Sequence, residues 1–78
     1  MQSFFERRGT SLDTTQPGIR HIQNLIRNHT PVSVMVFGGA EIEGQIQWQD
    51  LSYLAISQEG RPLTLVNRGA ITVLRALG

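Results

Sequence analysis

The sequence PVSVMVFGGAEIEGQIQWQD, residues 31–50, decides the fold of this chain because it has the pattern of a β-hairpin. Its first half alternates valines with other residues over positions 32–36, which is the two-residue period of a strand with two different faces. Gly38 and Gly39 predict the turn, since only glycine takes a positive φ without steric cost. The second half alternates again, so we expect its apolar residues to face a core and its polar residues to face solvent or a partner. The apolar set is Ile42, Gly44, Ile46 and Trp48, and the polar set is Glu41, Glu43, Gln45, Gln47 and Gln49.

Gly44 lies inside the predicted second strand, where a glycine costs stability. A glycine in the middle of a strand usually marks a bulge, a sharp bend or a close approach of another backbone. A long strand bent at a glycine is typical of a small, strongly curved sheet. We therefore expect a mainly β fold, with Trp48 in a core or an interface.

The segments around the hairpin predict one helix and three more short strands. Residues 17–29 carry apolar side chains three and four positions apart, and they begin with a proline that suits a first helical turn. After the hairpin, Asn67–Gly69 predicts a tight turn whose two end residues tolerate the left-handed conformation. The remaining predicted strands are residues 51–56, 63–66 and 70–74, with a loop at 58–62. The sequence thus predicts an N-terminal helix on a bent, five-stranded antiparallel sheet that forms a small open barrel.

The fourth and fifth strands are short and apolar, and in a monomer they would be exposed edges. Exposed apolar edges invite pairing with another chain, and edges that pair head to tail close into a ring when the rotation allows. A domain of this size is also marginally stable alone, and the sequence offers no disulfide or metal to stabilise it. We therefore expect an oligomer.

The composition of the chain excludes several classes of functional site. The chain has 78 residues and no cysteine, which excludes disulfides, thiolate metal sites and cysteine nucleophiles. No apolar run approaches the roughly 20 residues of a membrane span, so we expect a soluble cytoplasmic protein without membrane insertion. All seven basic residues are arginines, against six acids, for a formal net charge of +1. This is not the strongly basic balance of a typical nucleic-acid binder, although a few placed arginines are good phosphate ligands.

The sequence carries no enzymatic signature. Gly38-Gly39 lacks the following helix that a phosphate-binding loop needs, and no paired acids form a recognisable motif. His21 and His29 are eight residues apart with no third ligand four residues from either, so we expect solvated histidines and no metal.

Residues 1–16 show neither helical nor strand period, and we expect a mobile tail that precedes a domain of residues 17–78. Phe4-Phe5 followed by charged residues is interpreted as a docking peptide, a basic arm or a solvated terminus, the last being the rule for mobile termini.

Several motifs resemble the Hfq branch of the Sm-like proteins, over about residues 17–74. They are PVSV at 31–34, GQI at 44–46, the aspartate at 50 and AITV at 70–73. WQD at 48–50 and IRHIQNLIRNHTPV at 19–32 look most like the divergent cyanobacterial-type members. The resemblance implies a homohexameric ring that pairs the fourth strand of one subunit with the fifth of the next. It also implies an RNA chaperone without a cofactor, which binds single-stranded U-rich or A-rich RNA.

The resemblance places a uridine pocket on the helix face of the ring, with Arg68, Leu51 and Ser52 at its positions. Arg68 keeps a cation that can contact a phosphate or a carbonyl. Leu51 and Ser52 replace a glutamine and an aromatic residue, while Gly69 and Gly18 replace a histidine and a glutamine. We therefore expect Arg68 to be the main contact of this pocket.

The opposite face of the family ring takes purine-rich RNA, in a pocket whose positions are held here by Met35, Glu41 and Glu43, while Gly39 and Ile42 match the family and mainly shape the backbone. Two acids in every subunit repel phosphates, so we expect this face to be largely disabled for RNA.

The family also carries an arginine patch on its rim. Here Arg27 matches that patch, Gln23 and Asn24 add hydrogen-bonding groups, and Ile26 and His29 replace its other members. Asp50 is expected to be structural, with its carboxylate accepting backbone N–H bonds in a turn.

Two functions follow from the resemblance. The first is an RNA-binding ring in post-transcriptional regulation, with weak and salt-dependent affinity that acts through Arg68 at the pore and Arg27 at the rim. The alternative is a protein-interaction platform built on the same ring, with a type IV pilus motor ATPase as the candidate partner for motility. That partner would dock on the acidic face or on the helix face.

Overall fold

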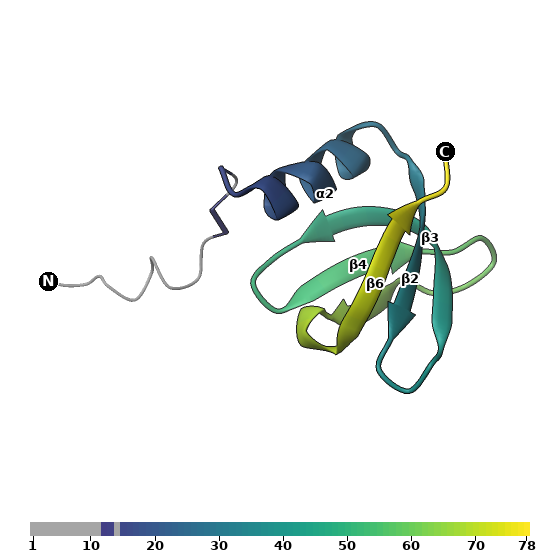
Figure 1. The fold of residues 1–78 in the computed structure, drawn as a ribbon. Helices are drawn as coiled ribbons and strands as arrows, with labels where there is room; N and C mark the ends of the chain where they lie inside the picture. Colours follow the sequence, from purple (N-terminus) through teal and green to yellow (C-terminus); the bar gives the residue numbers. More distant parts are fainter. Residues whose placement is uncertain (1–11, 14) are drawn as a thin grey trace, which may run out of the picture.

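The computed structural model describes residues 12, 13 and 15–78, and Figure 1 shows one helix lying across one end of a strongly curved sheet. The elements in chain order are α2 (Pro17–Arg27), β2 (Pro31–Val36), β3 (Glu41–Gln49), β4 (Tyr53–Ser57), β5 (Thr64–Asn67), the 3₁₀ helix η1 (Arg68–Ala70) and β6 (Ile71–Ala76). The strand order is β5-β4-β3-β2-β6, and every neighbouring pair is antiparallel. The predicted N-terminal helix on a five-stranded sheet is confirmed.

The predicted hairpin of β2 and β3 is present, and up to Ile46 its apolar residues lie on the predicted face. Val32 lies opposite Gly44 and Val34 lies opposite Ile42, so the apolar residues of both strands share one face. Gly38 and Gly39 form the turn with φ values of 98° and 96°, a region that costs other residues steric energy.

Helix α2 ends two residues earlier than predicted, because His29 adopts a left-handed conformation with φ of 54°. The His29 N–H donates to the Ile26 carbonyl at 3.1 Å, and the Thr30 N–H donates to the Leu25 carbonyl at 3.0 Å. These two bonds satisfy carbonyls that the end of a helix leaves without partners. His29 therefore terminates the helix.

The core lies between the apolar face of α2 and the concave side of the sheet. Leu25 is the buried residue of the helix, and Ile22 and Ile26 pack beside it. The buried core cluster consists of Leu25, Val32, Val34, Ile46, Leu54, Ile56 and Val66.

Gly44 marks a close approach between two backbones. A Cβ atom at this position would lie 2.2 Å from the Ser57 carbonyl oxygen and 2.8 Å from Cγ2 of Ile56, both on β4. In Figure 1, β3 rises from the hairpin beside β2 and then turns beneath α2. The glycine therefore lets the bent strand lie directly against β4.

A β-bulge follows, and it corrects the prediction for Trp48. Ile46 lies opposite Ile56, but Trp48 lies opposite Ala55, so Gln47 is an extra residue on β3. One extra residue exchanges the two faces of a strand. Trp48 was predicted to share the core side of Ile46, and this is wrong: its side chain is 41% exposed, while Gln49 turns inward.

Strands β5 and β6 form the two edges of the sheet, as predicted. Leu65 on β5 and Val73 on β6 are 50% and 38% exposed, respectively. The described chain thus presents an apolar side chain on each of two strand edges.

The tight turn predicted at Asn67–Gly69 is confirmed, and it forms without any left-handed residue. Asn67 has φ of −66°, and neither Asn67 nor Gly69 adopts a left-handed conformation. The Asn67 side-chain oxygen instead accepts a hydrogen bond from the Gly69 N–H at 2.8 Å, which caps the single 3₁₀ turn η1. A side-chain cap thus stabilises this turn, and the left-handed backbone conformation that both residue types tolerate is not used.

The N-terminal prediction falls largely outside the described residues, which exclude 1–11 and 14 and therefore Phe4-Phe5. Just before α2, the Asp13 carboxylate accepts hydrogen bonds from the side chain and the N–H of Thr15, which lower the pKa of Asp13. The Gln16 N–H donates to the Asp13 carbonyl at 3.1 Å. The boundary between residues 16 and 17 stays a prediction.

The close approach at Gly44 makes its replacement costly. We expect Gly44→Ala to lower the free energy of unfolding by about 1–3 kcal/mol, because the added methyl group must displace the backbone of β4. Gly18→Ala is the matched control, since an added Cβ in α2 meets no atom within 4 Å. Urea unfolding followed by circular dichroism at a fixed protein concentration measures both. Equal stability of the two variants would contradict the assigned role of Gly44.

Candidate functional site

The turn between β3 and β4 is organised by Asp50. Its Oδ1 atom accepts hydrogen bonds from the N–H groups of Ser52 at 2.9 Å and Tyr53 at 2.7 Å. The Asp50 N–H in turn donates to the Tyr53 carbonyl at 3.0 Å. The expectation that Asp50 is a structural turn residue is confirmed.

This turn holds Arg68 through the backbone. The Arg68 N–H donates to the Ser52 carbonyl at 2.8 Å, which places η1 against the β3–β4 turn. Leu51 and Ser52 are exposed on that turn, while Arg68 is half-buried. The structure therefore brings together the three residues predicted for the helix-face pocket.

A chain of side-chain hydrogen bonds runs from Arg68 to the helix. Arg68 Nη1 donates to Gln49 Oε1 at 3.0 Å, and Gln49 Nε2 donates to Gln23 Oε1 at 3.0 Å. Gln49 Nε2 also lies 3.4 Å from the carbonyl oxygen of Ile19. Gln49 thus links η1 at one end of the sheet with the middle of α2.

The sequence interpretation missed Gln49 because it assigned the residue to the solvent face of an uninterrupted strand. Only the bulge at Gln47 turns Gln49 inward. Gly44 raised the possibility of a bulge in this strand but not its position at Gln47, so the register of the folded sheet was needed to find it.

Arg68 also borders a small apolar hollow. Its other lining residues are Ile22, Leu54, Ile71 and Leu74. A guanidinium beside apolar walls is less well solvated than one in open water, which strengthens its interaction with an anion.

The rim forms a second, more polar hollow. It is lined by Thr15, Arg20, Gln23, Asn24 and Arg27. Arg27 Nη1 donates to Asn24 Oδ1 at 3.1 Å, which orients the guanidinium along the helix. Gln23 belongs both to this hollow and to the chain from Arg68, so the predicted pore and rim residues are connected. Ile26 packs on the core instead of lining the rim hollow.

The residues predicted for the opposite face do not all share one surface. Met35 lies opposite Glu41, and Ser33 lies opposite Glu43, so the two glutamates extend from the outer side of the sheet. The Ser33 hydroxyl donates to the Glu41 carboxylate. Ile42 instead packs against the core, and Gly39 lies in the hairpin turn away from the strands.

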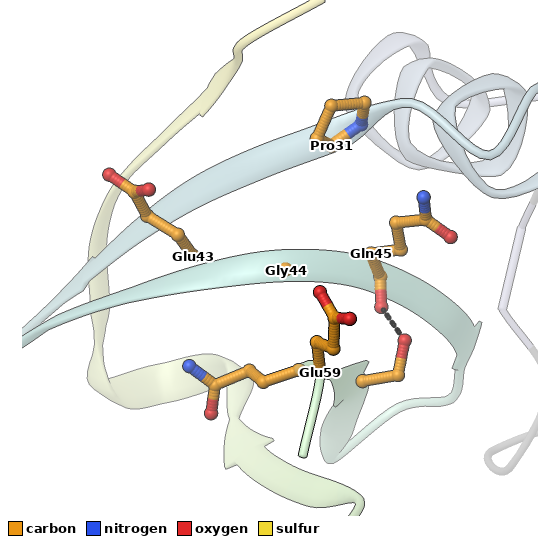
Figure 2. Close-up of a pocket in the computed structure, with 7 residues that line it drawn as sticks. Pro31, Glu43, Gly44, Gln45 and Glu59 are labelled. Carbon is orange, nitrogen blue, oxygen red and sulfur yellow. Dashed lines mark hydrogen bonds between the residues drawn. The ribbon is translucent and has the colours of Figure 1, made fainter. Parts of the chain in front are cut away.

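The same outer side contains an acidic hollow above Gly44. Figure 2 shows Glu43 and Glu59 on either side of the bare backbone of Gly44, with Pro31 and Gln45 at the edge of this hollow. The Ser57 hydroxyl donates to the Gln45 carbonyl at 3.3 Å, which fixes β4 below the hollow. Two carboxylates on one hollow repel phosphates and favour cationic groups.

Within the described part of the chain, no group of three histidine, aspartate, glutamate or cysteine side chains is arranged to hold a metal ion. His21 and His29 are both exposed. No helix among the described residues is long and apolar enough to cross a membrane.

The model of the Hfq-related family matches residues 16–76. The chain is similar to the crystal structure of an Hfq protein from Anabaena sp., with 33% identity and a TM-score of 0.71 over 77% of this chain and 95% of that one. No curated protein sequence matches the chain.

A second structure, of the pleiotropic translational regulator Hfq, shares the fold at 20% identity, with a TM-score of 0.75 over 83% of this chain and 97% of that one. The helix, the strand order and the bent β3 are therefore those of the Sm-like fold. Because the family model spans most of the chain and the Anabaena protein supports it at 33% identity, the chain belongs to the Hfq-related family.

Proposed function

We propose that the chain assembles into a homohexameric ring that binds single-stranded RNA and acts as an RNA chaperone in post-transcriptional regulation in the cytoplasm. The observation that carries this proposal is Arg68, held half-buried beside an apolar hollow by the hydrogen bond to Gln49. Membership of the Hfq-related family supports it, as does the structural likeness to a protein described as a pleiotropic translational regulator.

The two strand edges support the ring. Strands β5 and β6 each leave one side without a partner strand in the described chain, with Leu65 and Val73 exposed. Pairing β5 of one subunit with β6 of the next would cover both edges and repeat the same contact around the ring. Six copies of Arg68 would then act on one RNA, which raises the affinity without new kinds of contact.

The charge of the chain supports weak binding. Six copies of a chain with net charge +1 carry a modest total, and Glu41 and Glu43 add repulsion on the outer side of the sheet. We therefore assign RNA to the helix face and the rim, with Arg68 and Arg27 as the contacting cations, and expect affinity to fall steeply with salt.

Replacing Arg68 tests the proposal. We expect Arg68→Ala to weaken binding of fluorescently labelled oligouridine by about tenfold or more at low salt, because a charge-assisted contact is lost from every subunit. Arg61→Ala is the matched control, since it removes the same charge from an exposed loop residue. Fluorescence anisotropy measures the affinity, and light scattering verifies that each variant keeps the size of a hexamer. Absence of binding by an intact wild-type ring would overturn the proposed function.

A second function is favoured by the acidic hollow above Gly44. We propose as an alternative that the ring docks a protein with a basic surface, for which a type IV pilus motor ATPase is the candidate. Glu43 and Glu59 border the hollow and would pair with lysine or arginine side chains of that partner.

Charge neutralisation separates the two functions. We expect the double variant Glu43→Gln, Glu59→Gln to weaken capture of the purified ATPase several-fold while oligouridine affinity stays unchanged or rises. Arg68→Ala should have the opposite pattern. An ATPase that binds the wild type and the double variant equally well would place its docking site elsewhere.

A further inference from the structure

Hydrogen bonds link Arg68 to Gln49 and Gln49 to Gln23. The direction of these bonds decides which donor and acceptor groups of Arg68 and Gln23 remain available to a ligand. A guanidinium has five N–H donors and no acceptor, so Arg68 requires the oxygen of Gln49 to face it. The Gln49 amide nitrogen must then point the other way, where it donates to Gln23 Oε1 and to the Ile19 carbonyl. The Gln23 oxygen accepts this bond, so the NH₂ group of Gln23 must point away from Gln49 as a donor.

Both ends of this chain therefore present donors. At one end, Arg68 keeps the N–H groups that Gln49 does not use. At the other end, Gln23 lines the rim hollow together with Arg20 and Arg27, so its amide nitrogen is the donor that this residue can offer there. The Oδ1 atom of Asp50, in the adjacent turn, already accepts hydrogen bonds from two backbone N–H groups.

The surroundings of Arg68 favour a phosphate over a base. Leu51 and Ser52, which are exposed on the neighbouring turn, offer no aromatic ring on which a base could stack, and the exposed Tyr53 that follows them belongs to β4, where it lies opposite Asn67. The lining of the hollow beside Arg68 is aliphatic apart from the guanidinium itself. Stacking supplies much of the base affinity of single-stranded RNA sites, whereas a planar guanidinium binds phosphate through paired hydrogen bonds.

We propose that Gln49 is a positioning residue that fixes Arg68 and Gln23 as donors, so that the helix face contacts RNA backbone phosphates and does not discriminate between bases. This inference rests on the proposed RNA-binding function. The site then extends from Arg68 to the rim hollow, with Gln49 orienting the groups at both ends. Phosphate contacts position a nucleic acid without carrying sequence information, so the site selects single-stranded RNA by its charge and flexibility.

The experiment compares Gln49→Glu with Gln47→Glu. Both variants add one carboxylate per subunit to β3, but Gln47 is exposed and donates to the Ser57 hydroxyl, far from Arg68 in the hydrogen-bond network. In Gln49→Glu, the new carboxylate pairs with Arg68 and removes the donor to Gln23. We expect oligouridine affinity to fall about tenfold below that of Gln47→Glu, with a shallower dependence on salt because fewer phosphates are contacted.

Base discrimination is the second readout. The wild-type ring should bind oligouridine and oligocytidine of equal length within about threefold of each other, as expected when phosphates carry the binding. Gln49→Met, which removes the hydrogen bonds without adding charge, covers the case in which Gln49→Glu fails to assemble. It should weaken both oligomers by the same factor, and light scattering verifies the assembly of every variant.

The outcomes are distinguishable. If the wild type binds, Gln49→Glu matches Gln47→Glu and Gln49→Met matches the wild type, Gln49 has no positioning role and the inference is wrong while the proposed function stands. A preference of more than tenfold for oligouridine over oligocytidine would show that bases are recognised and would also overturn it. A wild-type ring that binds neither oligomer overturns the proposed function, and this inference with it.

Discussion

The contact between the backbones of β3 and β4 at Gly44 is the constraint on which the rest of the structure depends. No side chain separates the two strands there, so β3 can bend against β4 and continue beneath α2. The bulge at Gln47 then exchanges the faces of the last residues of the strand. Without both features, Gln49 would point to solvent and Arg68 would lose the partner that orients it. The bend and the bulge of β3 together determine the electrostatic geometry of Arg68, which lies on a different element.

The folded chain separates part of its charge by face, although Arg75 lies opposite Ser33 on the same side as Glu43. On the outer side of the sheet, Glu43 and Glu59 flank the hollow above Gly44. Guanidinium groups lie on the helix and on η1, at the sites of Arg20, Arg27 and Arg68. The net charge of +1 does not reveal this distribution, because the charges of the arginines and of the acidic residues nearly cancel over the whole chain. The distribution of charge over the surface is therefore a better guide to the partners of this protein than its total.

Most of the fold could be predicted from the sequence because its signals are local. Each of three patterns predicts a local conformation from a few neighbouring residues: the period of two in β2, the paired glycines of the turn and the apolar stripe of α2. The side of Trp48, the inward turn of Gln49 and the right-handed turn at Asn67 could not be predicted, since each depends on a hydrogen bond or a register set by another segment. The candidate site was predicted in part: Arg68, Leu51 and Ser52 do lie together, but the residue that connects Arg68 to Gln23 was missed for the same reason.

The pairing of β6 with β2 has a consequence for the order in which the sheet forms. Strands β2 to β5 are joined by short turns, whereas β6 must return across the whole meander so that Ala76 reaches Val32. Closing that long loop costs more chain entropy than closing a hairpin, so β6 should add last. Until it does, β2 is itself an open edge with Val34 uncovered, and the β6 segment of a second chain can occupy it as well as its own. Exchange of β6 between chains is therefore the misassembly to which this topology is most exposed, and crowded folding conditions would favour it.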